Sequence, residues 1–164
     1  MGASRELDFS EYSAARVQRF RRVAFALCGD WHSAEDLVQA MFVQRYRRWR
    51  RVRPDTADAY ARRILLNAFL AGRRKAGREH VTSEPPERAA PPDHDSHVRL
   101  DLERALTGLT PRQRAMVVLR FLEDLPVAEV AALLGVAEGT VKSQTARGVE
   151  ALRAALPAPM TEER

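Results

Sequence analysis

Basic and hydroxyl side chains recur at helical spacing near the end of the chain, where they could bind a polyanion. The residues predicted to face outward are Lys142, Ser143, Thr145 and Arg147. The apolar residues predicted to face the opposite, buried side are Val141, Val149 and Leu152. Cationic side chains bind phosphates, and arginine and hydroxyl groups also hydrogen-bond to base edges. This pattern predicts a helix whose outer face contacts nucleic acid.

The preceding residues can position such a helix as the second half of a helix-turn-helix. Pro126 suits a first helical position, and an apolar stripe follows it at helical spacing. Ala131 is small enough for two helices to cross closely, and Gly135 allows the turn a positive φ. We expect Thr140 to cap the second helix. An ordinary helical hairpin with solvated basic residues is the alternative, and the rest of the chain must decide between them.

Composition favours a nucleic-acid partner. The 164 residues carry a formal charge of +5, and the sequence pI is about 10.1, which favours a polyanionic partner over an acidic small substrate. Cys28 is the only cysteine, which excludes an intramolecular disulfide and a multi-cysteine zinc site; we expect it to be a core residue. No apolar run is long enough to span a membrane and no signal peptide begins the chain, so we predict a cytoplasmic protein without membrane insertion.

Residues 77–97 differ from the rest of the chain, because four prolines lie there among acidic residues with almost no apolar side chain. Such a segment predicts a flexible linker between two modules. The run from Asp93 to His97 also resembles a metal site, but a solvated linker explains it without a ligand. We therefore predict no metal, no cofactor and no catalytic residue.

The two modules, residues 7–76 and 98–156, have helical patterns and no strand signals. In the first, Ser33 begins a sequence typical of a capping box, and Thr56 can cap the last helix. In the second, Thr110, Pro111 and Gln113 combine a capping threonine, a first-turn proline and a reciprocal glutamine. The predicted fold class is all-α, with two small helical domains joined by a flexible linker.

An arginine run in the first module interleaves with aromatic residues. Its members are Arg45, Arg47, Arg48, Arg50, Arg51 and Arg53. The arginines are predicted to follow a DNA backbone or an acidic protein surface, whereas Tyr46 and Trp49 fit the buried side of the helix.

Three motifs in register resemble a known family. They are Ala34–Phe42 (AEDLVQAMF), Ala61–Asn67 (ARRILLN), and Leu109–Arg114 (LTPRQR) followed by Gly139–Ser143 (GTVKS). Their order and spacing resemble bacterial extracytoplasmic-function (ECF) sigma factors of the sigma-70 family. Gln144-Thr145 further resembles an actinobacterial, SigE-like subgroup. Ala40 and Ala71-Gly72 depart from the family pattern, which has acidic residues at these places.

The resemblance implies an RNA polymerase sigma factor that directs promoter-specific initiation without covalent chemistry. Its first domain (7–76) would bind core polymerase and melt the −10 element, a linker (77–97) would follow, and a helix-turn-helix domain (98–156) would bind the −35 element. The implied core-binding residues are Asp36, Leu37, Val38 and Gln39. Leu37 and Val38 fit the buried side of the helix equally well, so Asp36 and Gln39 are the expected surface contacts. The implied −10 residues are Asp55, Thr56, Arg62, Arg63 and Asn67. The implied −35 residues are Thr140, Lys142, Ser143, Thr145, Ala146 and Arg147.

The implied partners are the clamp helices and flap of core RNA polymerase, promoter DNA and, as an open question, an anti-sigma factor. The alternative function is a stand-alone helix-turn-helix regulator with an N-terminal helical sensor domain. That class needs a phosphoacceptor aspartate at a strand end or a large apolar ligand pocket, and the first module has the sequence pattern of neither. An enzyme is the third class, and only the run from Asp93 to His97 favours it.

Overall fold

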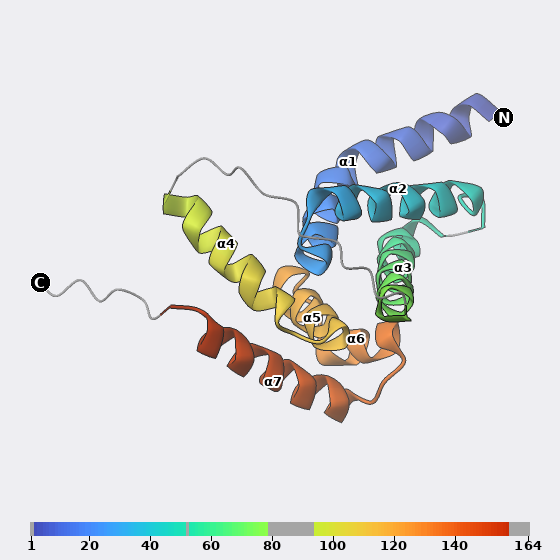
Figure 1. Ribbon diagram of the computed structural model, residues 1–164. Helices are drawn as coiled ribbons and strands as arrows, with labels where there is room; N and C mark the ends of the chain where they lie inside the picture. The colour runs from blue at the N-terminus through green and yellow to red at the C-terminus, as the bar shows by residue number, and fades with distance from the viewer. Residues whose placement is uncertain (1, 52, 79–93, 158–164) are drawn as a thin grey trace, which may run out of the picture. The chain divides into compact units, whose positions relative to one another are not determined.

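The computed structural model describes residues 2–51, 53–78 and 94–157, and all regular elements among them are helices. The chain divides into two compact units, residues 1–80 and 81–164. Both are drawn in Figure 1, where colour follows the chain from blue to red. The predicted all-α class with two helical domains is confirmed.

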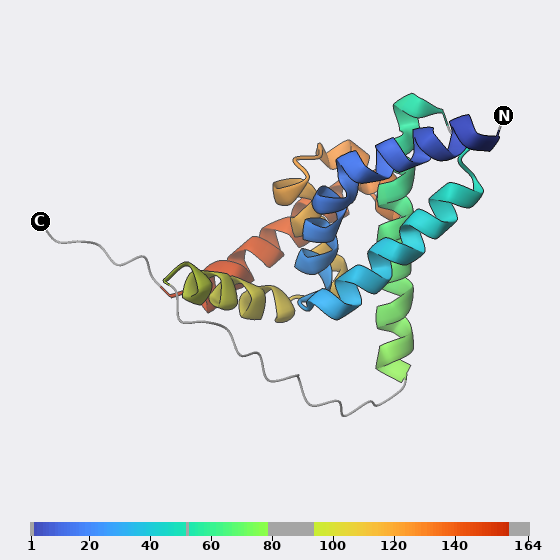
Figure 2. The same cartoon turned by 90° about the horizontal axis from the view of Figure 1, so that it is seen from above.

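Unit 1 contains three long helices. Helix α1 (Gly2–Cys28) packs along α2 (Trp31–Arg47), as Figure 2 shows. A short 3₁₀ helix, η1 (Pro54–Thr56), leads into α3 (Ala57–Arg78), which contacts both. The chain turns between α1 and α2 at Gly29, whose φ of 80° lies in the left-handed region that favours glycine.

The start of α2 differs from the prediction. Asp30 is the N-cap, and its carboxylate accepts a hydrogen bond from the backbone N–H of Ser33 at 2.7 Å. The predicted capping box beginning at Ser33 is therefore wrong, because an aspartate three residues earlier takes the capping role.

Aromatic side chains dominate the packing of α1 against α2. The ring of Phe9 meets those of Phe42, Tyr46 and Trp49 edge to face, at centroid distances of 6.3, 5.1 and 5.3 Å. Phe20, which is 2% exposed, also meets Phe42 edge to face. Edge-to-face contacts add directional preference to the burial of apolar area, so they fix how the two helices lie together.

Unit 2 contains α4 (His94–Thr107), α5 (Pro111–Val117), α6 (Val127–Leu134) and α7 (Glu138–Ala155). Helix α5 continues into a π-helical turn, η2 (Val118–Leu122). The predicted capping box is present, since Thr110 accepts from the Gln113 N–H while the Gln113 side chain accepts from the Thr110 N–H. Apolar side chains from α4, the α4–α5 connection, α5 and α7 pack together in the core of the unit: Leu106, Leu109, Val117 and Leu152.

Helices extend into both ends of the predicted linker. Helix α3 runs to Arg78 and α4 begins at His94, although the composition of residues 77–97 favoured an irregular segment throughout. The middle of that segment, residues 79–93, lies outside the described residues.

Candidate nucleic-acid interface

Helices α6 and α7 form the predicted helix-turn-helix. Gly135 ends α6 with a φ of 65°, and its N–H donates to the carbonyl of Ala131. Val136 donates to the same carbonyl, which completes the helix end. Ala131 is 6% exposed, as expected where two helices lie close together. Both residues therefore do what the sequence predicted.

The predicted first residues of the two helices are each displaced. Pro126 is the N-cap of α6 rather than its first residue. Ala137 is the N-cap of α7 and makes no side-chain cap, so Thr140 lies inside the helix and does not cap it. The turn after Gly135 is shorter than predicted, so α7 begins three residues earlier than a cap at Thr140 would place it.

The outer face of α7 presents five of the six predicted −35 residues. Those exposed are Thr140, Lys142, Ser143, Ala146 and Arg147. Thr145 instead lies on the buried side with Val141 and Gly148. The expectation that Thr145 faces outward is therefore wrong, because it follows Val141 by one helical turn and shares its face.

Two contacts with α5 fix the position of α7. The Gln113 amide nitrogen donates to the Gln144 amide oxygen at 2.9 Å, so the residue that completes the α5 capping box also holds α7. At Gly148, a Cβ would lie 2.8 Å from the Val117 Cγ2, a distance that requires something to move. A glycine in the middle of a helix is the sequence signal for such an approach.

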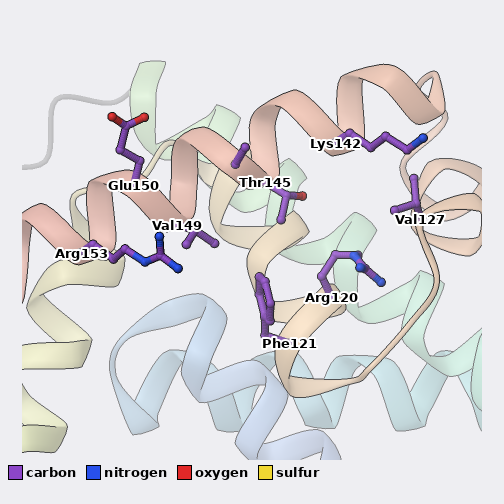
Figure 3. A pocket seen from close by; sticks show the side chains of 9 residues that line it. Arg120, Phe121, Val127, Lys142, Thr145, Val149, Glu150 and Arg153 are labelled. Carbon is purple, nitrogen blue, oxygen red and sulfur yellow. The ribbon is translucent and has the colours of Figure 1, made fainter.

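A groove lies beside the outer face of α7 within unit 2. Its volume is about 620 Å³, and it is lined by Arg120, Phe121, Val127, Lys142, Thr145, Ala146, Val149, Glu150 and Arg153. Figure 3 shows the Phe121 ring extending from η2 toward α7, between cationic side chains. Phe121 is 64% exposed. We call this site the η2–α7 groove; an exposed aromatic ring with cations around it suits a protein partner.

In unit 1, α2 presents part of the predicted core-binding set. Asp36 and Gln39 are exposed, and Leu37 is half-buried. Val38 is only 4% exposed and belongs to the core. Of the two places expected for Val38, the structure shows the core, because Val38 lies one turn after the buried Ala34 and on the same side of the helix.

The segment before α3 and the outer face of α3 carry the predicted −10 residues. Asp55 and Thr56 are exposed in η1, and Arg63 and Asn67 are exposed one helical turn apart on α3. Arg62 is 5% exposed. Arg62 is therefore buried within unit 1, unlike the other four predicted residues, and the structure does not present its side chain at the surface.

The arginine run separates into surface and core residues. Arg47, Arg48, Arg50, Arg51 and Arg53 are exposed. Arg45 is fully buried, and Tyr46, predicted to be buried, is 38% exposed. The boundary between the buried and exposed sides of α2 differs from the predicted one, because Arg45 follows the buried Met41 by one turn.

No cluster of metal-ligating side chains occurs within the described parts of the chain. Of the histidine-containing run, Asp93 and the side chains of residues 94–97 lie outside the described residues. Among the described residues, none of the helices is both long and apolar enough to cross a membrane. Cys28 is half-buried.

Comparisons with known proteins agree with this arrangement. Residues 14–79 match the family model described as Sigma-70 region 2, and residues 99–152 match the model described as Sigma-70, region 4. The chain is 37% identical to the RNA polymerase sigma-E factor of Streptomyces coelicolor, over 93% of this chain and 88% of that protein. It is 36% identical to the ECF RNA polymerase sigma factor SigE of Mycolicibacterium smegmatis, over 89% of this chain but only 60% of that longer protein.

A solved structure is also similar. It is the sigma factor RpoE from Bartonella quintana in complex with the anti-sigma factor NepR, with a TM-score of 0.72 and 26% identity. The match covers 90% of this chain and 96% of the Bartonella chain.

Proposed function

Because this chain belongs to the extracytoplasmic-function group of the sigma-70 family of RNA polymerase sigma factors, we propose that it binds core RNA polymerase and directs initiation at specific promoters. The observation that carries the proposal is the basic outer face of α7, which is presented by a helix-turn-helix whose turn and packing leave that face free. A second unit carries exposed polar and cationic groups of the kind needed to hold separated bases.

We assign −35 recognition to the exposed part of α7. Arg147 follows Ser143 by one turn, so the two side chains project from the same part of the helix. Arginine can bond bidentately to the O6 and N7 atoms of guanine, whereas Lys142 acts on phosphates as a point charge. Thr140 and Ala146 complete this surface, and buried Thr145 supports it from behind.

We assign −10 capture to Asp55, Thr56, Arg63 and Asn67. Unstacking a base costs a few kcal/mol, so a capture site needs hydrogen-bonding groups for base edges and a cation for the backbone. Asp55, Thr56 and Asn67 supply the former, and Arg63 supplies the latter. Residues 7–76 would thus form the −10 domain and residues 98–156 the −35 domain, with 77–97 between them.

Two surfaces suit core polymerase. On α2, Asp36 and Gln39 are exposed together with Val43, which is 51% exposed, and we propose that this face meets the clamp helices. In unit 2, the η2–α7 groove offers an exposed aromatic ring at its edge, and we propose that it receives the flap. Apolar centres with polar rims are typical of protein interfaces.

We extend the proposal to a regulatory partner, to the cellular location and to the absence of catalysis. The Bartonella relative was solved with an anti-sigma factor, and we propose that such a partner could also cover the core-binding surfaces of this chain. The chain would act in the cytoplasm, where the polymerase and chromosome are. Its function would be recognition and strand separation without covalent catalysis.

A pull-down with purified core polymerase tests the proposal. The wild-type chain should be retained, and Asp36→Arg combined with Gln39→Ala should weaken retention while helical content, measured by circular dichroism, stays the same. The matched control is Arg22→Ala, at an exposed position of α1 outside the proposed surfaces. A chain that binds promoter DNA but never core would instead be a stand-alone regulator.

A further inference from the structure

Arg45 is a charged residue in the core of unit 1. It is 0% exposed. None of its three guanidinium nitrogens has a hydrogen-bond partner among the described residues. Burying a charge without hydrogen-bond partners lowers the stability of the folded state. Stability alone therefore does not explain why an arginine occupies this position.

Three aromatic rings surround the Arg45 guanidinium. Its central carbon lies 4.6 Å from the Trp49 ring centroid, 5.3 Å from that of Tyr12 and 5.6 Å from that of Tyr60. Each distance is within the range of a cation–π attraction, which is strongest where water is excluded. The cage therefore stabilises the charge that burial would otherwise penalise.

The rings of the cage come from α1, from the turn after α2 and from α3. Tyr12 belongs to α1, Trp49 follows the end of α2, and Tyr60 lies in the first turn of α3. Trp49 and Tyr60 thus flank the segment 50–59, which contains η1 with its exposed Asp55 and Thr56. Arg45 touches both ends of that segment through one planar group.

A hydrogen-bonded chain extends the cage to the start of α3. The Tyr12 hydroxyl donates to the Asp58 Oδ1 at 2.9 Å, and the Arg16 Nε contacts the same oxygen at 2.5 Å. The Arg16 guanidinium also lies over the Tyr12 ring at 4.4 Å. Burial and the contact with Asp58 raise the pKa of Tyr12 to about 12, although nearby Arg45 opposes the shift. The phenol therefore remains a donor at neutral pH.

We propose that Arg45, Tyr12 and Asp58 are positioning residues that hold both ends of segment 50–59 and so set the geometry with which Asp55 and Thr56 capture −10 bases. The inference rests on the proposed function of that segment. Directional cation–π and hydrogen-bond contacts hold Trp49 and the start of α3 in one arrangement, which an apolar side chain at position 45 would not do, because hydrophobic packing is non-directional.

The test uses holoenzyme reconstituted from the full chain and core polymerase. The probe is a pool of single-stranded DNA randomised over the −10 segment, and the readout is base enrichment in the bound fraction. Arg45→Met removes the charge at similar length, and Tyr12→Phe removes only the hydroxyl. Arg22→Met is the matched control, since it makes the same change at an exposed position of α1.

Both variants should reduce base enrichment about tenfold, the size of one lost base contact. Affinity for core and preference in the −35 element should match those of the wild type, which a general loss of structure would not allow. Arg45→Lys should restore part of the enrichment, because it keeps the charge but lacks the planar group. If Arg45→Met does not fold, the Tyr12→Phe variant tests the inference by itself, since it leaves the ring packing in place.

Unchanged enrichment in folded Arg45→Met or Tyr12→Phe holoenzyme would overturn the inference. Asp55→Ala combined with Asn67→Ala separates this outcome from failure of the proposed function. If that double variant also leaves enrichment unchanged, the segment does not capture bases and the inference fails with the −10 assignment. If it alone reduces enrichment, only the positioning role is wrong.

Discussion

The two units are built from different side chains. All aromatic residues of the chain except Phe121 belong to unit 1, where they pack α1 against α2 and surround a buried cation. Unit 2 packs aliphatic and small residues, and its one aromatic side chain is 64% exposed at the η2–α7 groove.

This difference corresponds to two kinds of DNA recognition. A helix that lies in a major groove needs a rigid support, and small residues such as Ala131 and Gly148 let the helices of unit 2 approach closely. Capture of separated bases needs a shaped segment between helices, and large rings with a guanidinium can hold both of its ends. The comparison predicts that equivalent substitutions have unequal effects in the two units.

The largest difference should come from removing one phenylalanine from each unit. Phe20→Ala should destabilise unit 1 by about 3–5 kcal/mol, because a buried ring leaves a cavity. Phe121→Ala should change stability by less than about 0.5 kcal/mol and weaken binding to core instead. Urea denaturation and a core-binding titration measure the two effects. Equal stability losses would mean that Phe121 belongs to a core, which would contradict the comparison.

A second pair separates base recognition from charge on α7. Arg147→Ala should cost about 1–3 kcal/mol at one −35 position and relax preference there. Lys142→Ala should weaken all sequences alike and lower the salt slope by about one. Transcription by holoenzyme from singly substituted promoters distinguishes them. A uniform loss for Arg147→Ala would make it a phosphate contact, and no loss for either would remove α7 from the recognition model.

The close helix approach in unit 2 can be tested at Gly148. Gly148→Ala should destabilise the unit by about 1–2 kcal/mol, because the clash with Val117 exceeds the gain in helix propensity. Gly139→Ala is the matched control on the same helix; no atom lies within 4 Å of its added Cβ, so stability should not fall. The loss at Gly148 should shrink in a Val117→Ala background. An equal response of both glycines would show that α5 and α7 are not closely packed there.

The narrowest effect, confined to alkaline pH, should come from titrating Tyr12 in unit 1. Its pKa is raised from 10.0 to about 12 in the folded chain, so the folded state holds this proton more tightly than the unfolded state does. The resulting stability is present below pH 10 and is lost as the pH rises to 12. We expect a loss on the order of 2 kcal/mol by pH 12 that Tyr12→Phe does not share, measured by urea unfolding across this range. Identical pH profiles would exclude the proposed hydrogen-bonded state.

Local signals predicted much of the fold. Gly135 and the Thr110 capping box form within a few residues of sequence, so neighbouring residue types were sufficient to predict them. The predicted caps at Ser33 and Thr140 were wrong. At α2 the nearby Asp30 caps the helix instead, and α7 begins at a residue that makes no side-chain cap. The choice depends on where the chain enters the helix, which packing decides.

Burial of individual site residues was less predictable. Helical periodicity gives the direction of a face but not its width. Thr145, near such a boundary, was therefore assigned to the wrong side, and the place of Val38 could not be decided. Arg62 and Arg45 were counted with exposed arginines because charge usually indicates exposure. The cage around Arg45 joins three segments distant in sequence, and no local pattern could have predicted it.

The most direct test of the division of labour is promoter opening, measured by permanganate reactivity of unpaired thymines. Wild-type chain with core polymerase should open a cognate promoter, whereas the chain without core should not. Asp55→Ala combined with Asn67→Ala should abolish opening while −35 binding by the holoenzyme persists, and Arg147→Ala should reduce occupancy of the same promoter. Opening by the free chain, or unchanged opening by the Asp55 and Asn67 double variant, would contradict the account.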